Sequence, residues 1–263
     1  MTGQATVLAA SIPWPPSVND FYLPSLTSGT YPWLTKFTLL VWLAVALIIV
    51  FFLVAYRNPK LVPGKAQWLA ESIYNFGRDS VARDVIGVEG VRFAPYLTTL
   101  FCFVLVTNLF GIIPFLQISP NAHIAFPALL AFISWVLYLY LGVRKHGFLG
   151  YLKFVTIVPG VPWPMLLLVA PLEFLSTILL RPFTLSLRLF ANMFAGHVVL
   201  LVFTLGGFVL ANSSALFIKP ISVVSWLMAI LLTFFELLIA VLQAYVFALL
   251  TASYVQGALA EDH

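Results

Sequence analysis

Residues 163–202 read WPMLLLVAPLEFLSTILLRPFTLSLRLFANMFAGHVVLLV, an apolar run about twice as long as an upright helix needs to cross a bilayer. Arg188 lies inside this run, where a permanent charge costs about 2.5–3.5 kcal/mol on insertion scales. Arg181 precedes it and Asn192 follows it at helical spacing, so the three share roughly one helix face. Such an arginine faces a bundle interior or an ion path, unless it extends to a lipid headgroup or pairs internally. Arg188 is therefore the first candidate for a functional residue.

The composition is that of a polytopic membrane protein. Of 263 residues, 62% are hydrophobic and 8% are charged, against about 25% charged residues in an average soluble domain. We expect one all-α membrane domain over 34–263, with no room for a soluble catalytic domain. The net charge of +4 comes from basic residues in loops beside apolar spans, which excludes a nucleic-acid patch. Cys102 stands alone in an apolar run, so we expect neither a disulfide framework nor a cysteine metal site. We also expect no cofactor and no other metal site.

Apolar segments separated by polar loops predict about five membrane crossings. Basic residues gather in the polar stretches 57–92 and 144–153, which marks these stretches as cytoplasmic by the positive-inside rule. The proline-rich tail 1–33 then lies outside the cell membrane, and the C-terminus lies in the cytoplasm. The expected spans are about 34–56, 93–116, 124–143, 163–210 and 219–257.

The first cytoplasmic stretch contains an amphipathic pattern over 65–86. Leu69, Ile73 and Phe76 recur at helical spacing, opposite Glu71 and Arg78. We expect a helix that lies on the cytoplasmic membrane surface.

Two polar residues near the outer membrane edge receive simpler interpretations. Asn108, close to the end of the second span, is expected to make a polar helix contact. His123, between the second and third spans, is expected to be an exposed surface histidine.

The last two apolar regions, 163–210 and 219–257, are too long for upright helices. Each either breaks into two spans or forms one long, strongly tilted helix, and no charged turn divides either one. Pro171 and Pro182 would kink the first helix without ending it. A hairpin turn at 210–220 would make the two helices antiparallel neighbours.

An antiparallel hairpin brings particular polar residues to the same level. If Gln243 lies level with Arg188, then Glu236 lies level with about position 195, and His197 is its natural partner. Glu173 lies on the other side of Arg188, toward the cytoplasm. Titratable groups would then flank one cation that does not titrate.

Each of these polar residues also has a purely structural interpretation. Asn192 and Gln243 could form ordinary interhelical hydrogen bonds, and the histidine–glutamate pair could simply hold two helices together. Glu173 could pair with Arg181. Small residues beside Arg188 weaken the structural interpretation, because they permit close approach by another helix: Ala191, Ala195 and Gly196.

Three stretches resemble subunit a of the F-type ATP synthase. They are TLSLRLFANMFAGH at 184–197, NLFGIIPF at 108–115 and ELLIAVLQAYVFALL at 236–250. The resemblance runs from the first span to the C-terminus and implies a proton-conducting stator subunit in the cell membrane. It implies a ring of small carboxylate-bearing membrane subunits and a peripheral stalk as partners. Catalysis would belong to other subunits of the complex.

The resemblance also implies roles for individual residues. Arg188 would be the essential arginine that faces the ring carboxylate, with Asn192 beside it and Gln243 nearby on the last helix. His197 and Glu236 would line an outer proton half-channel, and Glu173 would belong to the proton pathway on the cytoplasmic side.

The sequence departs from the family pattern in three places. Many bacterial members carry the acid and the histidine of the outer pair in exchanged positions, and many have glycine where Ala191 stands. The spacing from Glu173 to Arg188 is one residue longer than in most bacterial forms. The alternative functions are a secondary ion transporter, for which the paired repeats are missing, and a structural scaffold, which would not need charges at depth.

Overall fold

The computed structural model describes residues 35–113, 119–156, 163–213, 217 and 219–260, and this part of the chain is helical without strands. The N-terminal half contains α2 (Lys36–Ala55), α3 (Lys65–Asn75), the π-helix η2 (Phe76–Ile86), the 3₁₀ helix η3 (Val88–Phe93), α4 (Ala94–Leu109) and the 3₁₀ turn η4 (Pro120–Ala122). The C-terminal half contains α5 (Ala125–His146), α6 (Phe148–Thr156), α7 (Trp163–Leu175), the π-helix η5 (Ser176–Leu180), α8 (Arg181–Ala211) and α9 (Lys219–Leu259). The predicted external tail 1–33 lies outside the described residues.

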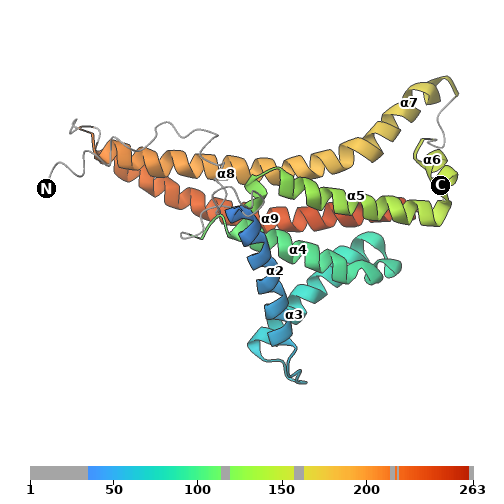
Figure 1. The fold of residues 1–263 in the computed structure, drawn as a ribbon, viewed down its shortest axis with the longest axis horizontal. Helices are drawn as coiled ribbons and strands as arrows, with labels where there is room; N and C mark the ends of the chain where they lie inside the picture. The colour runs from blue at the N-terminus through green and yellow to red at the C-terminus, as the bar shows by residue number, and fades with distance from the viewer. Residues whose placement is uncertain (1–34, 114–118, 157–162, 214–216, 218, 261–263) are drawn as a thin grey trace.

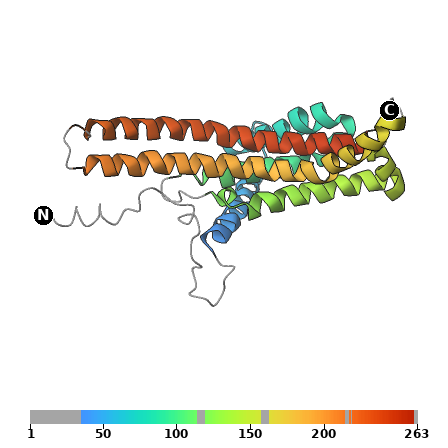
Figure 2. The same cartoon turned by 90° about the horizontal axis from the view of Figure 1, so that it is seen from above.

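Five helices of the described chain are long and apolar enough to cross a membrane, as the sequence predicts. The two longest, α7–η5–α8 and α9, run side by side as an antiparallel hairpin (Figures 1 and 2). Neither breaks into two spans. Helix α9 has 41 residues and is therefore about 60 Å long, against a hydrocarbon core of about 30 Å. If its apolar length stays in the core, the hairpin must incline by about 60° from the membrane normal.

The interface between α4, α8 and α9 forms the centre of the molecule. Helix α9 presents alanines at every fourth position, Ala240, Ala244, Ala248 and Ala252, and all four are buried. These small side chains let the neighbouring helices approach closely. Larger buried residues of α4 and α8 fill the remaining space: Leu100, Val104, Leu185, Leu189 and Met193.

The second crossing ends earlier than predicted. Helix α4 stops at Leu109, whereas the sequence argument extended it to 116, of which 114–116 lie outside the described residues. The amides of Gly111 and Ile112 bond to carbonyls only three residues earlier, a tightened last turn. Ile113 precedes Pro114, and a residue before proline disfavours the helical conformation.

The helix predicted over 65–86 is present as α3 and η2, with the predicted bounds. Its second half packs on protein, because the ring centroid of Phe76 lies 5.3 Å from that of Phe101 and 5.7 Å from that of Tyr245. Val81 is also buried against α4 and α9. Leu69, expected on the apolar face, is exposed on the surface of the chain. The location of this helix on the membrane surface stays a prediction.

Candidate functional site

Helix α8 has one face buried in the protein and one face open. The buried face carries Leu185, Leu189, Met193 and His197 at four-residue spacing. The open face carries Arg188, with other exposed residues at helical spacing: Thr184, Ala191, Asn192, Ala195 and Val199. Arg188 makes no ion pair or hydrogen bond with any described residue. Its guanidinium is therefore available to a group outside this chain.

Asn192 connects the open face of α8 to α9. Its Nδ2 donates to Oε1 of Gln243 over 2.8 Å, and Gln243 is buried. The Nε2 of Gln243 has no hydrogen-bond partner among the described residues. The sequence argument took Gln243 to lie level with Arg188; in the structure the His197–Glu236 contact puts position 243 level with about position 190, between Arg188 and Asn192. Gln243 sits on the buried side of α9, and Asn192 is the polar side chain of α8 that reaches it.

His197 and Glu236 form the pair that the antiparallel register predicts. His197 Nδ1 lies 2.6 Å from Glu236 Oε1, and both side chains are buried. Apart from this contact, neither carboxylate oxygen has a hydrogen-bond donor among the described residues. Gly196 makes room for the carboxylate, because a Cβ at this position would lie 3.1 Å from Glu236 Oε1.

A loop that the sequence analysis did not connect to the site reaches the other side of the imidazole. The backbone N–H of Ser119 donates to His197 Nε2 over 3.2 Å. Ser119 Oγ donates to the carbonyl of Thr107, and Asn121 Nδ2 donates to Asn108 Oδ1 over 2.7 Å. Asn108 in turn donates to the carbonyl of Ala240 on α9, so it does make the helix contact expected of it.

The sequence held one signal for this loop. Adjacent polar residues, Thr107 and Asn108, stand at the end of an apolar span and precede the turn residues Ser119, Pro120 and Asn121. All of these except proline need hydrogen-bond partners when buried.

His123 is not the exposed histidine that the sequence analysis expected. It is half-buried, and its ring centroid lies 5.6 Å from that of Phe37. The first turn of α2 packs over η4 and covers it. No functional role follows from this contact.

The charged residues that precede Arg188 along the chain, Glu173 and Arg181, do not pair with each other as His197 and Glu236 do. Glu173 is half-buried on α7 and makes no ion pair with Arg181, so that structural interpretation is wrong. The π-helix η5 lies between them and changes the angular register of the helix. Its carbonyls accept side-chain donors from α5, with Trp135 Nε1 bound to Ile178 O and Tyr138 Oη bound to Thr177 O.

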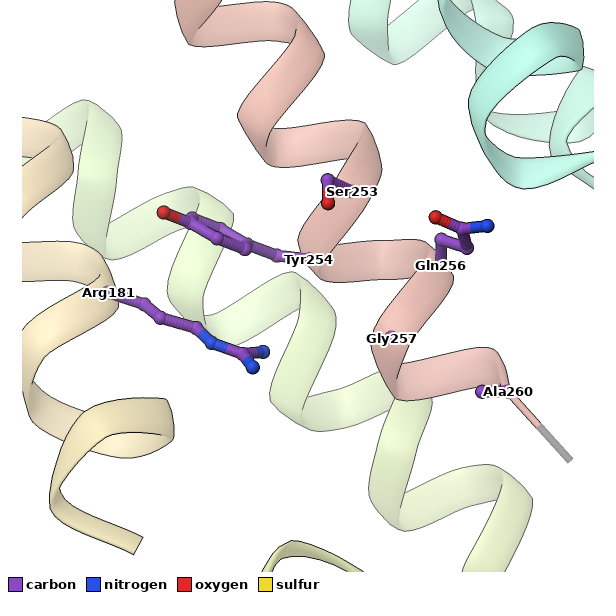
Figure 3. A pocket seen from close by; sticks show the side chains of 6 residues that line it. All are labelled: Arg181, Ser253, Tyr254, Gln256, Gly257 and Ala260. Carbon is purple, nitrogen blue, oxygen red and sulfur yellow. The ribbon is translucent and has the colours of Figure 1, made fainter. Parts of the chain in front are cut away.

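Arg181 instead extends toward the C-terminal end of α9. Its Cζ lies 5.4 Å from the centre of the Tyr254 ring, a cation–π contact. Together they border a pocket of about 400 Å³, and Figure 3 shows the guanidinium pointing toward Gly257. Ser253, Gln256 and Ala260 complete its wall.

Comparisons with known proteins agree with this architecture. A family model described as ATP synthase A chain matches residues 38–256. A protein named ATP synthase subunit a from Nocardioides sp. is 44% identical over 95% of this chain and 94% of its own length. Its namesake from Rhodococcus erythropolis is 44% identical over 100% of this chain and 96% of its own length. A third, from Streptomyces lividans, is 46% identical over 86% and 79% of the respective chains. The chain therefore belongs to the ATP synthase A chain family.

Proposed function

We propose that this chain is the proton-conducting stator subunit of a rotary F-type ATP synthase, with Arg188 opposite the carboxylates of a rotating ring of small membrane subunits. The observation that carries the proposal is the state of Arg188, which is exposed on the open face of α8 without a partner among the described residues. Ala191 and Ala195 on the same face leave room for a neighbouring helix. Family membership supports a role in ATP synthesis and proton transport.

Charge arithmetic shows what such an arginine does to a passing carboxylate. At about 4 Å and an effective dielectric near 20, the two charges attract by about 4 kcal/mol. This is a factor of about 10³ in favour of the charged carboxylate, at 1.36 kcal/mol per tenfold. A ring carboxylate that arrives protonated from lipid therefore releases its proton near Arg188. Because the guanidinium never gives up its own proton, it also blocks direct passage between the two sides.

Two offset half-channels turn this exchange into rotation. His197 and Glu236 line the outer half-channel in this proposal, with Asn192 and Gln243 between them and Arg188. Glu173 lies along the cytoplasmic half-channel. Each charge that crosses 100 mV supplies about 2.3 kcal/mol, so several crossings are needed for each ATP made by the other subunits.

The proposed setting is the cell membrane, with the N-terminus outside and the C-terminus in the cytoplasm. The partners are the ring, the membrane subunits of a peripheral stalk and the surrounding bilayer. The chain itself performs no ATP chemistry.

The test is coupled pumping by variants of Arg188 in the assembled complex. Arg188→Lys keeps the charge but loses the fork of donors and the fixed protonation, so we expect ATP-driven acidification of inverted vesicles to vanish. Arg188→Ala should also abolish coupling and should allow passive proton leak. Arg144→Lys, the same change at an exposed position in the last turn of α5, should pump normally. Near-normal pumping by assembled Arg188→Lys would overturn the proposal. Pumping only in the presence of sodium would mean that the transported ion is sodium and not the proton.

A further inference from the structure

Both ring nitrogens of His197 are engaged, from opposite directions. Nδ1 faces Glu236 Oε1 at 2.6 Å, and Nε2 accepts the backbone N–H of Ser119 at 3.2 Å. A backbone N–H can only donate, so Nε2 must present its lone pair. The proton of the neutral ring therefore sits on Nδ1, where it faces the carboxylate. A second proton on Nε2 would have to displace Ser119.

The loop that carries this N–H is held from several sides. Ser119 Oγ donates to Thr107 O over 3.0 Å and accepts the backbone N–H of Asn121 over 3.2 Å. Asn121 Nδ2 donates to Thr107 Oγ1 over 2.8 Å and to Asn108 Oδ1 over 2.7 Å. These four residues are at most 1% exposed. Because a buried network of this kind loses several bonds if one member turns away, the Ser119 N–H is fixed in its direction.

Glu236 is much less constrained than the imidazole. Apart from the 2.6 Å contact of Oε1 with His197 Nδ1, its oxygens have no hydrogen-bond donor among the described residues, although the side chain is buried. Gly196 packs closely against Oε1, where an added Cβ would lie only 3.1 Å away, and Oε2 is the oxygen that no described residue contacts with a donor. Oε2 can therefore hold a proton without displacing an existing partner.

We propose that Ser119, through its backbone N–H, holds His197 in a single neutral tautomer, and that Glu236 is the group of this pair that takes up and releases the proton. The inference rests on the proposed proton-conducting function and adds a division of labour within its outer half-channel. His197 positions the carboxylate and remains uncharged, and Ser119 is a positioning residue that acts through His197. In the loading step the carboxylate gains a proton from hydronium and leaves water.

The test compares two substitutions of Ser119 in the intact complex. Ser119→Pro removes the N–H, and the backbone already has φ −82° and ψ 131°, values close to those of a proline followed by another proline. Ser119→Ala keeps the N–H and loses only the hydroxyl. ATP synthesis is measured in inverted vesicles at a fixed total driving force, with the pH of the lumen, which corresponds to the outer side, set between 5.5 and 7.5.

We expect Ser119→Ala to keep the wild-type pH profile, even if its rate is lower. In Ser119→Pro nothing occupies the lone pair of Nε2, so the imidazole is free to take a second proton as the pH of the lumen falls. The resulting imidazolium stabilises Glu236 as a charged carboxylate and stops it from loading. The rate of Ser119→Pro should therefore fall about tenfold between pH 7.5 and 5.5 relative to the wild type. Identical profiles for the two variants, or the same acid sensitivity in Ser119→Ala, would overturn the inference.

A second pair of variants covers the case in which Ser119→Pro does not assemble. His197→Gln offers a carbonyl to the Ser119 N–H and an amide to Glu236 but cannot become charged, whereas Glu236→Gln cannot carry a proton. We expect His197→Gln to retain at least about a third of the flux and Glu236→Gln to lose more than about tenfold. Equal loss in both refutes the division of labour. If Arg188→Lys still loses coupling in that event, the proposed function stands without this inference.

Discussion

Replacing Gly111 with alanine would place a methyl group where the His197 ring now lies. An ideal Cβ at position 111 falls 2.5 Å from His197 Nε2 and still closer to Cε1, and ordinary contact requires about 3.5 Å, so the ring or the loop must retreat by more than about 1 Å. A retreat of the ring stretches its 3.2 Å bond from Ser119 beyond hydrogen-bond range. Overpacking of this kind costs about 1–3 kcal/mol. If the whole of this cost is added to the free-energy barrier of proton transfer, pumping falls by about 5- to 150-fold.

Other glycines of the chain provide graded controls for the same measurement. At Gly196 the added Cβ would lie 3.1 Å from Glu236 Oε1, so a shift of a few tenths of an ångström relieves it. At Gly257 the nearest atom is Arg181 Nη1 at 3.9 Å, an ordinary contact. Both glycines are helical, where alanine is favoured by about 1 kcal/mol. We expect less than about fivefold loss for Gly196→Ala and wild-type pumping for Gly257→Ala.

The assay is ATP-driven acidification of inverted vesicles, recorded with a pH-sensitive dye and normalised to the amount of assembled complex. Assembly is followed separately by copurification of the ring and the soluble ATPase. Wild-type pumping by Gly111→Ala, or a loss in Gly257→Ala as large as that in Gly111→Ala, would refute the packing argument.

The outer pair and the topology supply two further predictions. Leucine in place of either His197 or Glu236 should slow proton flow, and the exchange His197→Glu with Glu236→His should recover more flux than either single leucine variant. An exchange no better than the worse single variant would mean that the two side chains do not share one environment. Cysteines at Ser28 and Ser213 should react with an impermeant reagent from outside intact cells, and one at Ala260 only after permeabilisation. Labelling of Ala260 from outside would contradict the five-crossing topology.

The helices and the outer pair were predictable because they depend on local or simple periodic signals. Apolar runs bounded by charged loops gave spans close to α2 and α5, and continuous length without a charged turn favoured the long hairpin. Counting residues along two antiparallel helices was sufficient to bring His197 to Glu236. The same count did not predict that Gln243 is buried and bonded to Asn192, because counting residues does not show which side of each helix is buried.

Two features could not be predicted in this way. One is the contact of Ser119 with His197, and the other is the separation of Glu173 from Arg181. Ser119 reaches Nε2 through a backbone N–H, a group that every residue except proline carries, so no side-chain pattern marks it. The π-helix η5 shifts the register between Glu173 and Arg181, and its carbonyls are bound by α5, which is distant in sequence. Both features depend on tertiary contacts that a single sequence does not reveal.

Arg188 differs from other polar residues of the hairpin in the contacts that its side chain makes. Asn192 bonds to Gln243, Ser225 bonds to a carbonyl of α8, and Arg181 has an aromatic ring beside it. Arg188 has no comparable partner among the described residues. A cation kept only for structure would be expected to make its contacts within its own chain, since an uncompensated charge at this depth costs about 2.5–3.5 kcal/mol. A group on another subunit that returns repeatedly to Arg188 would offset that cost. A carboxylate that is charged only while it lies beside Arg188 would offset it as well, and it could leave again because it departs in the neutral form.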